Sequence, residues 1–551
     1  MIGSNERPSY TTRARHAIRY LAMRRTAVVF GVLLLFIWCG ANIPAIVYGT
    51  AKVPYPQDYI GDEPSPVSGA LHVLESRSLL AFRNDPSVYY GPVFPILAIP
   101  AVLVDYGVQR LDGVVHSSVE YRNRLIYNWG GIIVCIRILA VLFSLLALWA
   151  FWKSLNEERG APWVPFVATG ILATDYYFFE YAHFFEHWVI VIPMLLVQFS
   201  TMLSIRNTPK SKRLWVFHCF AALIAAGVSY ISLLSMVMWV PLLLTWLREK
   251  RWQLIRRFLY LCLALVIGTG LVILWDPYPF IRLLGFLGVG PLASPAHSGQ
   301  NPFLGGNFSF IYYGAEVVLN HLSYFVAAAV MAVAVGARRL MNDSFLQAAA
   351  LVVVFNFLLF APAQHHEGRY MLPVIVFLLL IFGRILTLYV ASNRRYTLLV
   401  GAAILLGIIV QTASVGGLVA RYAEGPPEAA VLNSVQEDPS PILAIGGDQL
   451  AVSLTPTAYL RYAAQSARTG TNLYQALTRV PPPPHTRLFD ITYIASSTVS
   501  KNTSLLTGYK TILVESDQSF STVNGYNAID ENIARIWFAR DFFPTYTQIK
   551  P

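Results

Sequence analysis

About eleven apolar runs divide this chain, and they constrain its fold more than any other feature. A helix that crosses a membrane needs about 20 predominantly apolar residues, and most of the runs approach that length. They lie near 27–48, 131–152, 163–179, 187–204, 214–230, 232–247, 258–275, 323–337, 345–363, 371–390 and 397–419. Hydrophobic residues make up 55% of the chain and charged residues only 13%, whereas soluble domains carry about 25% charged residues. The sequence therefore predicts a multi-pass α-helical membrane protein.

The positive charges predict the orientation of these runs. Short cytoplasmic loops of membrane proteins are enriched in Lys and Arg, so the Arg-rich tail 1–26 is expected inside. The loops then predicted inside contain Lys153, Arg159, Arg206, Lys210, Lys212, Arg213, Arg248, Lys250, Arg251, Arg256, Arg257, Arg338, Arg339, Arg394 and Arg395. Short loops predicted outside contain almost none. The net charge of +11 therefore indicates membrane topology, and no basic-aromatic module indicates a nucleic-acid partner.

This orientation divides the chain into three parts. A cytoplasmic tail (1–26) precedes a transmembrane domain (27–420), and residues 421–551 are expected outside the cytoplasm. Short β-like runs alternate with helical patterns in the last part and predict a small α/β domain. The runs cover 441–446, 489–495, 510–515 and 535–539, with a helical pattern at 457–467 between them.

The first outer loop, 49–130, contains two features that bear on function. One is the apolar, proline-punctuated stretch 91–104, which we interpret as interfacial or re-entrant, because a span there would invert every later loop. The other is the adjacent pair Asp62 and Glu63. They precede a helix start with Ser65 as the expected N-cap and Pro66 at the first helical position.

The residues after this acidic pair predict an amphipathic helix on the membrane. Val67, Ala70, Leu71 and Leu74 form its apolar stripe. The acids then lie near a positive helix end, where an ionised carboxylate is favoured and can act as a general base. The alternative is that both are solvated loop acids beside a helix cap.

The string HFFEHW, His183 to Trp188, matches the inverted zinc-protease signature H-x-x-E-H. A zinc-protease helix lies in an active site, whereas this string lies at the entrance of an apolar run on the predicted outer face. Two other interpretations are an interfacial aromatic belt and a second active-site loop. The candidates for such a loop are Glu180, His183, Glu186 and His187. On one helical face, Glu186, His183 and His187 could hold a divalent metal.

Several motifs together resemble a known superfamily. They are the DE pair at 62–63, the amphipathic helix after it, the string YYGPVFPIL (89–97), the Arg-containing run 136–149 and the string RYMLP (369–373). In layout, residues 25–390 resemble the GT-C superfamily of polyprenyl-phosphate-sugar-dependent glycosyltransferases. The similarity is strongest to the branch of bacterial aminoarabinose transferase and the protein O-mannosyltransferases.

The resemblance implies a site. The first-loop acid is the base of that family, which points to Asp62, with Glu63 as its neighbour or substitute. A second outer loop supplies another acid, usually Asp, and this chain has Glu186 there. Cations must stabilise a departing lipid phosphate, and the candidates are Arg137 and Arg369. Alternatively, Arg137 pairs with a first-loop acid and Arg369 anchors the chain at the interface.

The expected activity is transfer of a hexose or pentose from a polyprenyl-phosphate donor to a hydroxyl of a glycan, lipid or protein. Attack opposite the lipid phosphate predicts inversion at the anomeric carbon. The sequence implies no certain cofactor, and the divalent metal considered above is the one candidate. The expected location is a bacterial inner membrane. Rival interpretations are a flippase for lipid-linked saccharides, disfavoured because no two-fold repeat is visible, and a non-catalytic scaffold.

Overall fold

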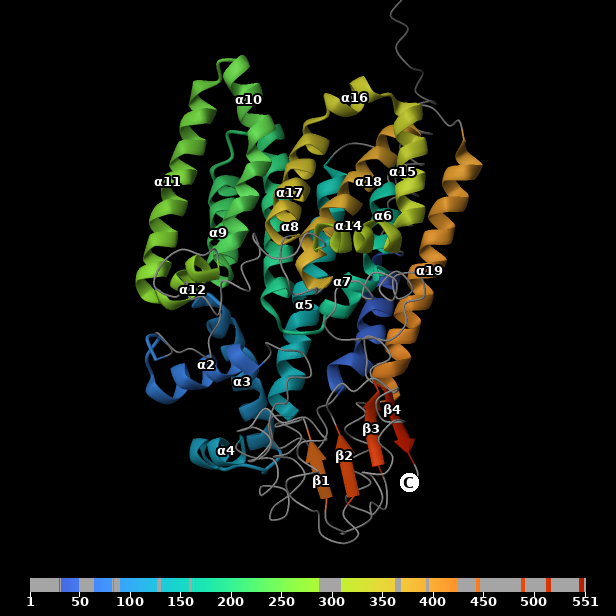
Figure 1. The fold of residues 1–551 in the computed structure, drawn as a ribbon. Helices are drawn as coiled ribbons and strands as arrows, with labels where there is room; N and C mark the ends of the chain where they lie inside the picture. Colours follow the sequence, from blue (N-terminus) through green and yellow to red (C-terminus); the bar gives the residue numbers. More distant parts are fainter. Residues whose placement is uncertain are drawn as a thin grey trace, which may run out of the picture.

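The structure, a computed structural model, is a helical bundle with a small sheet at one end (Figure 1). It describes residues 29, 31–48, 64–81, 83, 90–125, 130–157, 161, 163–286, 309–361, 368–392, 396–424, 442–445, 487–490, 512–516 and 545–549.

Helices follow the apolar runs. After the helix Gly31–Val47 come α2 (Pro64–Ser76), α3 (Val93–Leu111), α4 (Ser118–Leu125), α5 (Gly130–Asn156), α6 (Val164–Ala173), α7 (Tyr176–Tyr181), α8 (His187–Asn207) and α9 (Lys212–Val228). The chain continues with the 3₁₀ helix η1 (Tyr230–Trp239), α10 (Val240–Arg248), α11 (Trp252–Trp275), α12 (Tyr278–Phe286), α14 (Ser309–Asn320), α15 (Leu322–Val335), α16 (Ala337–Met341), α17 (Ser344–Phe360), η2 (Gly368–Met371), α18 (Leu372–Ser392) and α19 (Thr397–Glu424).

Each of the expected apolar runs contains a helix, but the count of eleven spans is not confirmed. Within the described residues, seven helices are long and apolar enough to cross a membrane. The number is eight if α14 and α15, which meet at a bend of 76°, form one broken span. Several remaining segments are shorter, such as Gly31–Val47 and Val164–Ala173. The molecule is a multi-pass helical membrane protein, and the exact number of crossings stays a prediction.

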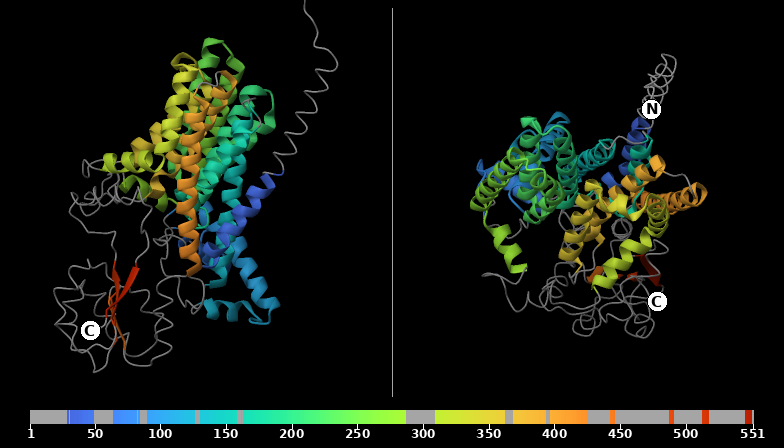
Figure 2. Two further views of the ribbon diagram at one scale, coloured as in Figure 1. Left: turned by 90° about the vertical axis from the view of Figure 1, so that its right-hand side faces the viewer. Right: turned by 90° about the horizontal axis from the view of Figure 1, so that it is seen from above.

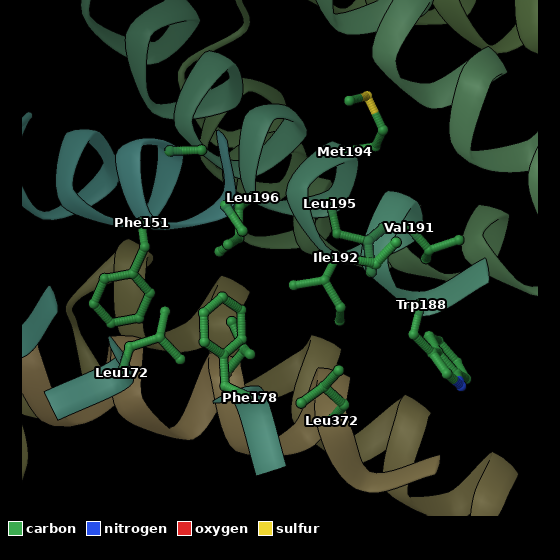
Figure 3. Packing of buried hydrophobic residues seen from close by; sticks show 14 of the residues in the cluster. Phe151, Leu172, Phe178, Trp188, Val191, Ile192, Met194, Leu195, Leu196 and Leu372 are labelled. Carbon is green, nitrogen blue, oxygen red and sulfur yellow. The ribbon is translucent and has the colours of Figure 1, made fainter. Parts of the chain in front are cut away.

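Helix α8 forms the centre of the bundle. It is apolar on every side, and the whole of its most hydrophobic stretch is buried, as expected for a helix surrounded by others. Figure 3 shows Val191, Ile192 and Leu195 of this helix packed in a cluster with Phe178 and Leu372, which belong to α7 and α18. By contrast, only 11% of the corresponding stretch of α11 is buried, as expected for a helix that faces lipid.

The bundle has two ends that different segments form. Helices α2, α3 and α4 lie at one of them, which we call the first-loop end (Figure 1). The turn between α10 and α11 lies at the other, together with α16 (Figure 1). Those two segments carry Arg248, Lys250, Arg251, Arg338 and Arg339, so we call this the basic end. The first-loop end also carries arginines, among them Arg110 on α3 and Arg122 and Arg124 on α4, so the predicted orientation, in which the basic end faces the cytoplasm, stays a prediction.

Four strands form one sheet, which lies near the first-loop end (Figures 1 and 2). They are β1 (Ile442–Ile445), β2 (Arg487–Asp490), β3 (Ile512–Ser516) and β4 (Thr545–Ile549), in that order. The first three run parallel, with Leu443 opposite Leu488, and β4 pairs antiparallel to β3. Three strands overlap the predicted runs. The expected strand 535–539 and helix 457–467 lie outside the described residues, so the α/β domain stays a prediction.

Two details of the first loop differ from expectation. Helix α2 begins at Pro64, so Ser65 lies in its first turn and is not an N-cap, and its buried hydroxyl has no hydrogen-bond partner among the described residues. The stretch 91–104 falls largely in α3, which by length and composition could cross a membrane. Its interpretation as an interfacial segment stays a prediction.

Candidate functional site

The string HFFEHW lies at a break between two helices. Helix α7 ends at Tyr181, α8 begins at His187, and residues 182–186 are not helical. The expectation that His183, Glu186 and His187 share one helical face is therefore wrong. The aromatic run around them suits a helix in pattern, but Glu186 in this turn is bound by Arg369 from a distant segment.

A metal site at this turn stays a prediction. Within the described part of the chain, no group of three or more His, Cys, Asp or Glu side chains is arranged to hold a metal ion. A zinc site needs about four ligands that converge on one point. The carboxylate of Glu186 is instead bound to a cation, which we describe next.

Glu186 and Arg369 form a buried ion pair. Nη1 of Arg369 donates to Oε1 of Glu186 at 2.8 Å. The Glu186 side chain is fully buried, whereas that of Arg369 is 16% exposed. Arg369 belongs to η2, directly before α18, so the pair joins two segments separated by 183 residues. Two of the predicted site residues are thus brought into direct contact.

His183 is fully buried beside this pair, within an aromatic shell. Its ring centroid lies 4.0 Å from that of Phe184 and 4.8 Å from that of Tyr422 on α19. Neither ring nitrogen meets the geometry of a hydrogen bond to the described residues. Burial, and then the nearby charge of Arg137, lower the pKa of His183 well below its ordinary value, and the Phe179 backbone opposes them only weakly. The imidazole is therefore neutral.

His187 connects the turn to the first outer loop. Its ring stacks on Tyr90 with centroids 4.2 Å apart, and Phe185 stacks on Phe94 of α3 at 5.2 Å. Gly91 lies between these two aromatic contacts, and its N–H donates to the carbonyl of Val228 at 3.0 Å. A Cβ atom at Gly91 would lie 2.1 Å from a backbone oxygen of the α9 end, so only glycine allows this approach.

Arg137 has a structural role in this arrangement. It lies on α5 and is 1% exposed, and its Nη1 donates to the carbonyls of Ala45 at 3.1 Å and Tyr48 at 2.5 Å. These carbonyls belong to the C-terminal end of helix Gly31–Val47, where backbone oxygens lack intrahelical partners and cations are favoured. The guanidinium also lies 5.3 Å from the ring centroid of Phe184. Its role in phosphate binding stays a prediction.

A second buried pair, not expected from the sequence, fixes the start of α7. Asp175 is the N-cap of this helix, with Oδ1 accepting from the Phe178 N–H at 2.9 Å. Its Oδ2 lies 2.6 Å from Nε2 of His321, and Nδ1 of His321 lies 2.8 Å from the carbonyl of Val317. Both partners of the imidazole are acceptors, so this geometry fits a positively charged His321 paired with Asp175.

A polar network extends from that pair across three helices. The hydroxyl of Tyr177 donates to Oε1 of Glu316 on α14 at 2.6 Å, and Nδ2 of Asn320 donates to the same hydroxyl at 2.9 Å. On α19, Nε2 of Gln411 donates to the Asn320 carbonyl at 2.8 Å, and its Oε1 accepts from the Tyr176 N–H at 3.0 Å. One sequence signal could have indicated this network. Glu316 and His321 are ionisable residues inside the apolar stretch 309–335, and burying such residues in a membrane is costly unless they have a function.

Glu180 lies on α7, which is too short to cross a membrane. It is 8% exposed. Burial raises the pKa of Glu180 to about 8, with further contributions from the charges of Glu316 and Glu186. Glu180 therefore holds its proton at neutral pH, unlike an ordinary surface carboxyl.

Asp62 and Glu63 lie outside the described residues. They directly precede α2, whose Val67 and Ala70 are fully buried, with Leu71 and Leu74 packed against the same core. The predicted apolar stripe is therefore confirmed. It packs into the protein core and against α3, whereas the sequence predicted a helix lying on the membrane.

A protein-family model matches most of the membrane domain. The model of the Alg9-like mannosyltransferase family matches residues 93–441, a segment that starts after Asp62 and includes Glu180, Glu186 and Arg369. The search of curated protein sequences found no significant match. Among solved structures, the chain is similar to ArnT from Cupriavidus metallidurans in the apo state, with 13% identity, a TM-score of 0.47 and coverage of 96% of this chain and 98% of that one. The same ArnT bound to undecaprenyl phosphate gives 13% identity, a TM-score of 0.44 and coverage of 95% and 97%.

Proposed function

The chain belongs to the Alg9-like mannosyltransferase family, a GT-C family of glycosyltransferases, and from this premise we propose that it transfers a sugar from a polyprenyl-phosphate donor to an acceptor hydroxyl at the outer face of the membrane. The family match covers most of the membrane domain and is the observation that carries the proposal. The name of the family makes mannose the first sugar to test. Glycans, lipids and proteins are the acceptor classes.

The buried ion pair supplies the cation for the donor phosphate. In this proposal the guanidinium of Arg369 binds the phosphate, because its planar donors match phosphate oxygens and it is the partly exposed member of the pair. Glu186 orients Arg369 through the 2.8 Å contact. The polyprenyl chain then lies against the apolar helices, and the sugar lies toward the first outer loop.

Asp62 is the proposed general base. It directly precedes α2, which packs against α3 at the first-loop end. A carboxylate there would take the proton of the acceptor hydroxyl as it attacks the anomeric carbon. Attack from the face opposite the phosphate gives inversion, by the logic that applies to inverting hydrolases. Aromatic contacts between the first loop and the turn 182–186 support this placement, since Tyr90 stacks on His187.

The test is sugar transfer by the full chain reconstituted in liposomes. Polyprenyl-phosphate donors carrying radiolabelled mannose, glucose, galactose or arabinose are supplied with a membrane extract as acceptor source. We expect label from at least one donor to move into a product that resists the mild acid hydrolysis that cleaves sugar phosphates. Anomeric analysis of that product should show inversion. Hydrolysis-sensitive label alone, with every donor, would contradict the proposal.

A further inference from the structure

The basic end contains a cavity that none of the candidate site residues lines. It has a volume of about 800 Å³ and lies where α15, α16 and the start of α17 meet the second half of α18. Helix α16 crosses the end of the bundle here, between α15 and α17 (Figure 1). Pockets for small ligands have volumes of about 300–1,000 Å³, so a small polar group fits this cavity.

A tight turn forms one wall of the cavity. Helix α15 ends at Val335, and the next residue, Gly336, has a φ of 90°, a backbone conformation that residues with a side chain rarely adopt. Helix α16 begins directly after this glycine and carries Arg338 and Arg339, which both line the cavity. The glycine turn therefore brings two adjacent arginines to the same wall.

Positive charge exceeds negative charge around the cavity. Its lining includes three arginines, Arg338, Arg339 and Arg384, and one carboxylate, Asp343. That carboxylate is already engaged, since Oδ2 accepts from Nη2 of Arg384 at 2.6 Å and Oδ1 accepts from a backbone N–H of α17. Arg338 and Arg339 are exposed, and no ion pair within the described ranges holds either guanidinium. Two cations therefore remain available to an anion in the cavity.

The cavity adjoins apolar surface of the kind that contacts lipid. Its lining also includes Val335 and Leu388, which are apolar. In the last turn of α15, Val333 is 80% exposed, and Met341 at the end of α16 is 72% exposed. Exposed apolar side chains beside a polar cavity are typical of a membrane contact. An occupant with an anionic head and an apolar tail matches both parts of this surface, whereas a soluble anion matches the arginines alone.

We propose that this cavity binds the headgroup of an anionic phospholipid, with the guanidinium groups of Arg338 and Arg339 contacting its phosphate. Arginine suits this ligand because its planar donors match phosphate oxygens. Basic pockets between transmembrane helices are a general means of binding such headgroups. Arg384 stays paired with Asp343, and the acyl chains lie along the exposed face of α15. The site does not depend on the proposed transferase function.

The experiment measures lipid binding by the full chain in detergent with native mass spectrometry. One probe is dioleoylphosphatidylglycerol, which is anionic, and the other is dioleoylphosphatidylcholine, which has the same acyl chains and no net charge. Inorganic phosphate is added as a competitor that represents a soluble anion. Wild type is compared with the double variant Arg338→Gln with Arg339→Gln. The control, Arg248→Gln with Lys250→Gln, removes two exposed charges at the same end but outside the cavity.

We expect wild type to bind one phosphatidylglycerol molecule more tightly than phosphatidylcholine. The cavity double variant should lose about 10- to 30-fold in affinity for phosphatidylglycerol, because each arginine near an anionic headgroup contributes roughly fivefold. Its unfolding temperature without lipid should match that of wild type, and the control should bind as wild type does. Asp343→Asn keeps a side chain that can cap α17 but removes the negative charge, so it should bind phosphatidylglycerol more tightly. Misfolding cannot produce such a gain.

Equal affinity of wild type and the cavity double variant for phosphatidylglycerol would overturn this inference, as would equal affinity of wild type for the two lipids. An equal loss of binding in the control would show that the basic end attracts lipid as a diffuse charged surface, without a site at the cavity. Displacement of the lipid by inorganic phosphate would assign the cavity to a soluble anion and would overturn the lipid assignment.

Discussion

Two Arg–carboxylate pairs, one at each end of the bundle, have similar contact distances but different surroundings. At the basic end, Arg384 of α18 contacts Oδ2 of Asp343 through Nη2 at 2.6 Å and Nε at 3.0 Å. Asp343 is also the N-cap of α17, since its Oδ1 accepts from the Leu346 N–H. This carboxylate is fully used in holding α17 and α18 together.

At the first-loop end, Glu186 occupies the N-cap position of α8 but makes no side-chain cap bond. Its carboxylate contacts Arg369 instead, and it lies among other buried ionisable groups: Glu180, His183, His187, Glu316 and the Asp175–His321 pair. Burying so many polar groups is costly unless they have a role. The comparison indicates different roles. The Asp343–Arg384 pair caps α17 and joins it to α18, whereas the Glu186–Arg369 pair belongs to the candidate site. The predictions below test this difference.

The largest effect on transfer is expected at the first-loop end from Asp62→Asn. This change removes the proposed base and should reduce transfer by about 10²- to 10⁴-fold, with thermal stability unchanged. Initial rates and unfolding temperature in the same liposomes measure both quantities. Equal rates for Asp62→Asn and wild type would remove Asp62 from the mechanism.

The next effect concerns stability and separates the two roles of Arg369. Arg369→Gln leaves the fully buried Glu186 without this cation and should lower the free energy of unfolding by about 3–5 kcal/mol. The double variant Arg369→Gln with Glu186→Gln should recover most of that loss, because no charge then remains uncompensated. Denaturation in detergent provides the measurement. If the double variant is as unstable as the single one, the pair has no such electrostatic role.

A smaller effect is expected from Arg384→Gln at the basic end. Asp343 would still cap α17 and is 10% exposed, so water can partly solvate it. We expect a loss of about 1–3 kcal/mol in stability and normal transfer per folded molecule. A transfer defect in the folded fraction would contradict the contrast between the ends.

The smallest effect is expected from Arg338→Gln, because this side chain is exposed at the basic end. Stability should change by less than about 0.5 kcal/mol, and transfer should be unchanged. Cysteine labelling from either side of sealed vesicles should also still place this segment on the cytoplasmic side. Labelling from the opposite side would reverse the predicted orientation.

The local pattern was enough to locate the helices. Apolar runs predict helices wherever the chain must satisfy its backbone inside a membrane, and each expected run contains one. The same pattern missed the break at 182–186, because an aromatic run with His and Glu suits a helix equally well. At the break, Glu186 binds Arg369, a contact between residues 183 positions apart that the local pattern does not reveal.

The candidate site was predictable in part. An Arg in an apolar run is costly, so Arg137 was expected to have a partner, but backbone carbonyls of the first helix could not be foreseen. The partners of α7 were missed because Asp175 and His321 are 146 residues apart, and Tyr177 and Glu316 are 139 apart. Single-sequence reasoning has no means of pairing residues over such separations.

The most direct test of the central claim is transfer by two matched double variants in which each ion pair is neutralised. One is Glu186→Gln with Arg369→Gln, and the other is Asp343→Asn with Arg384→Gln. Both remove two charges of opposite sign, and rates are normalised to folded protein in the same liposomes. We predict that the first variant loses transfer and that the second retains it. Equal transfer by the two would contradict the assignment of the first-loop end as the site.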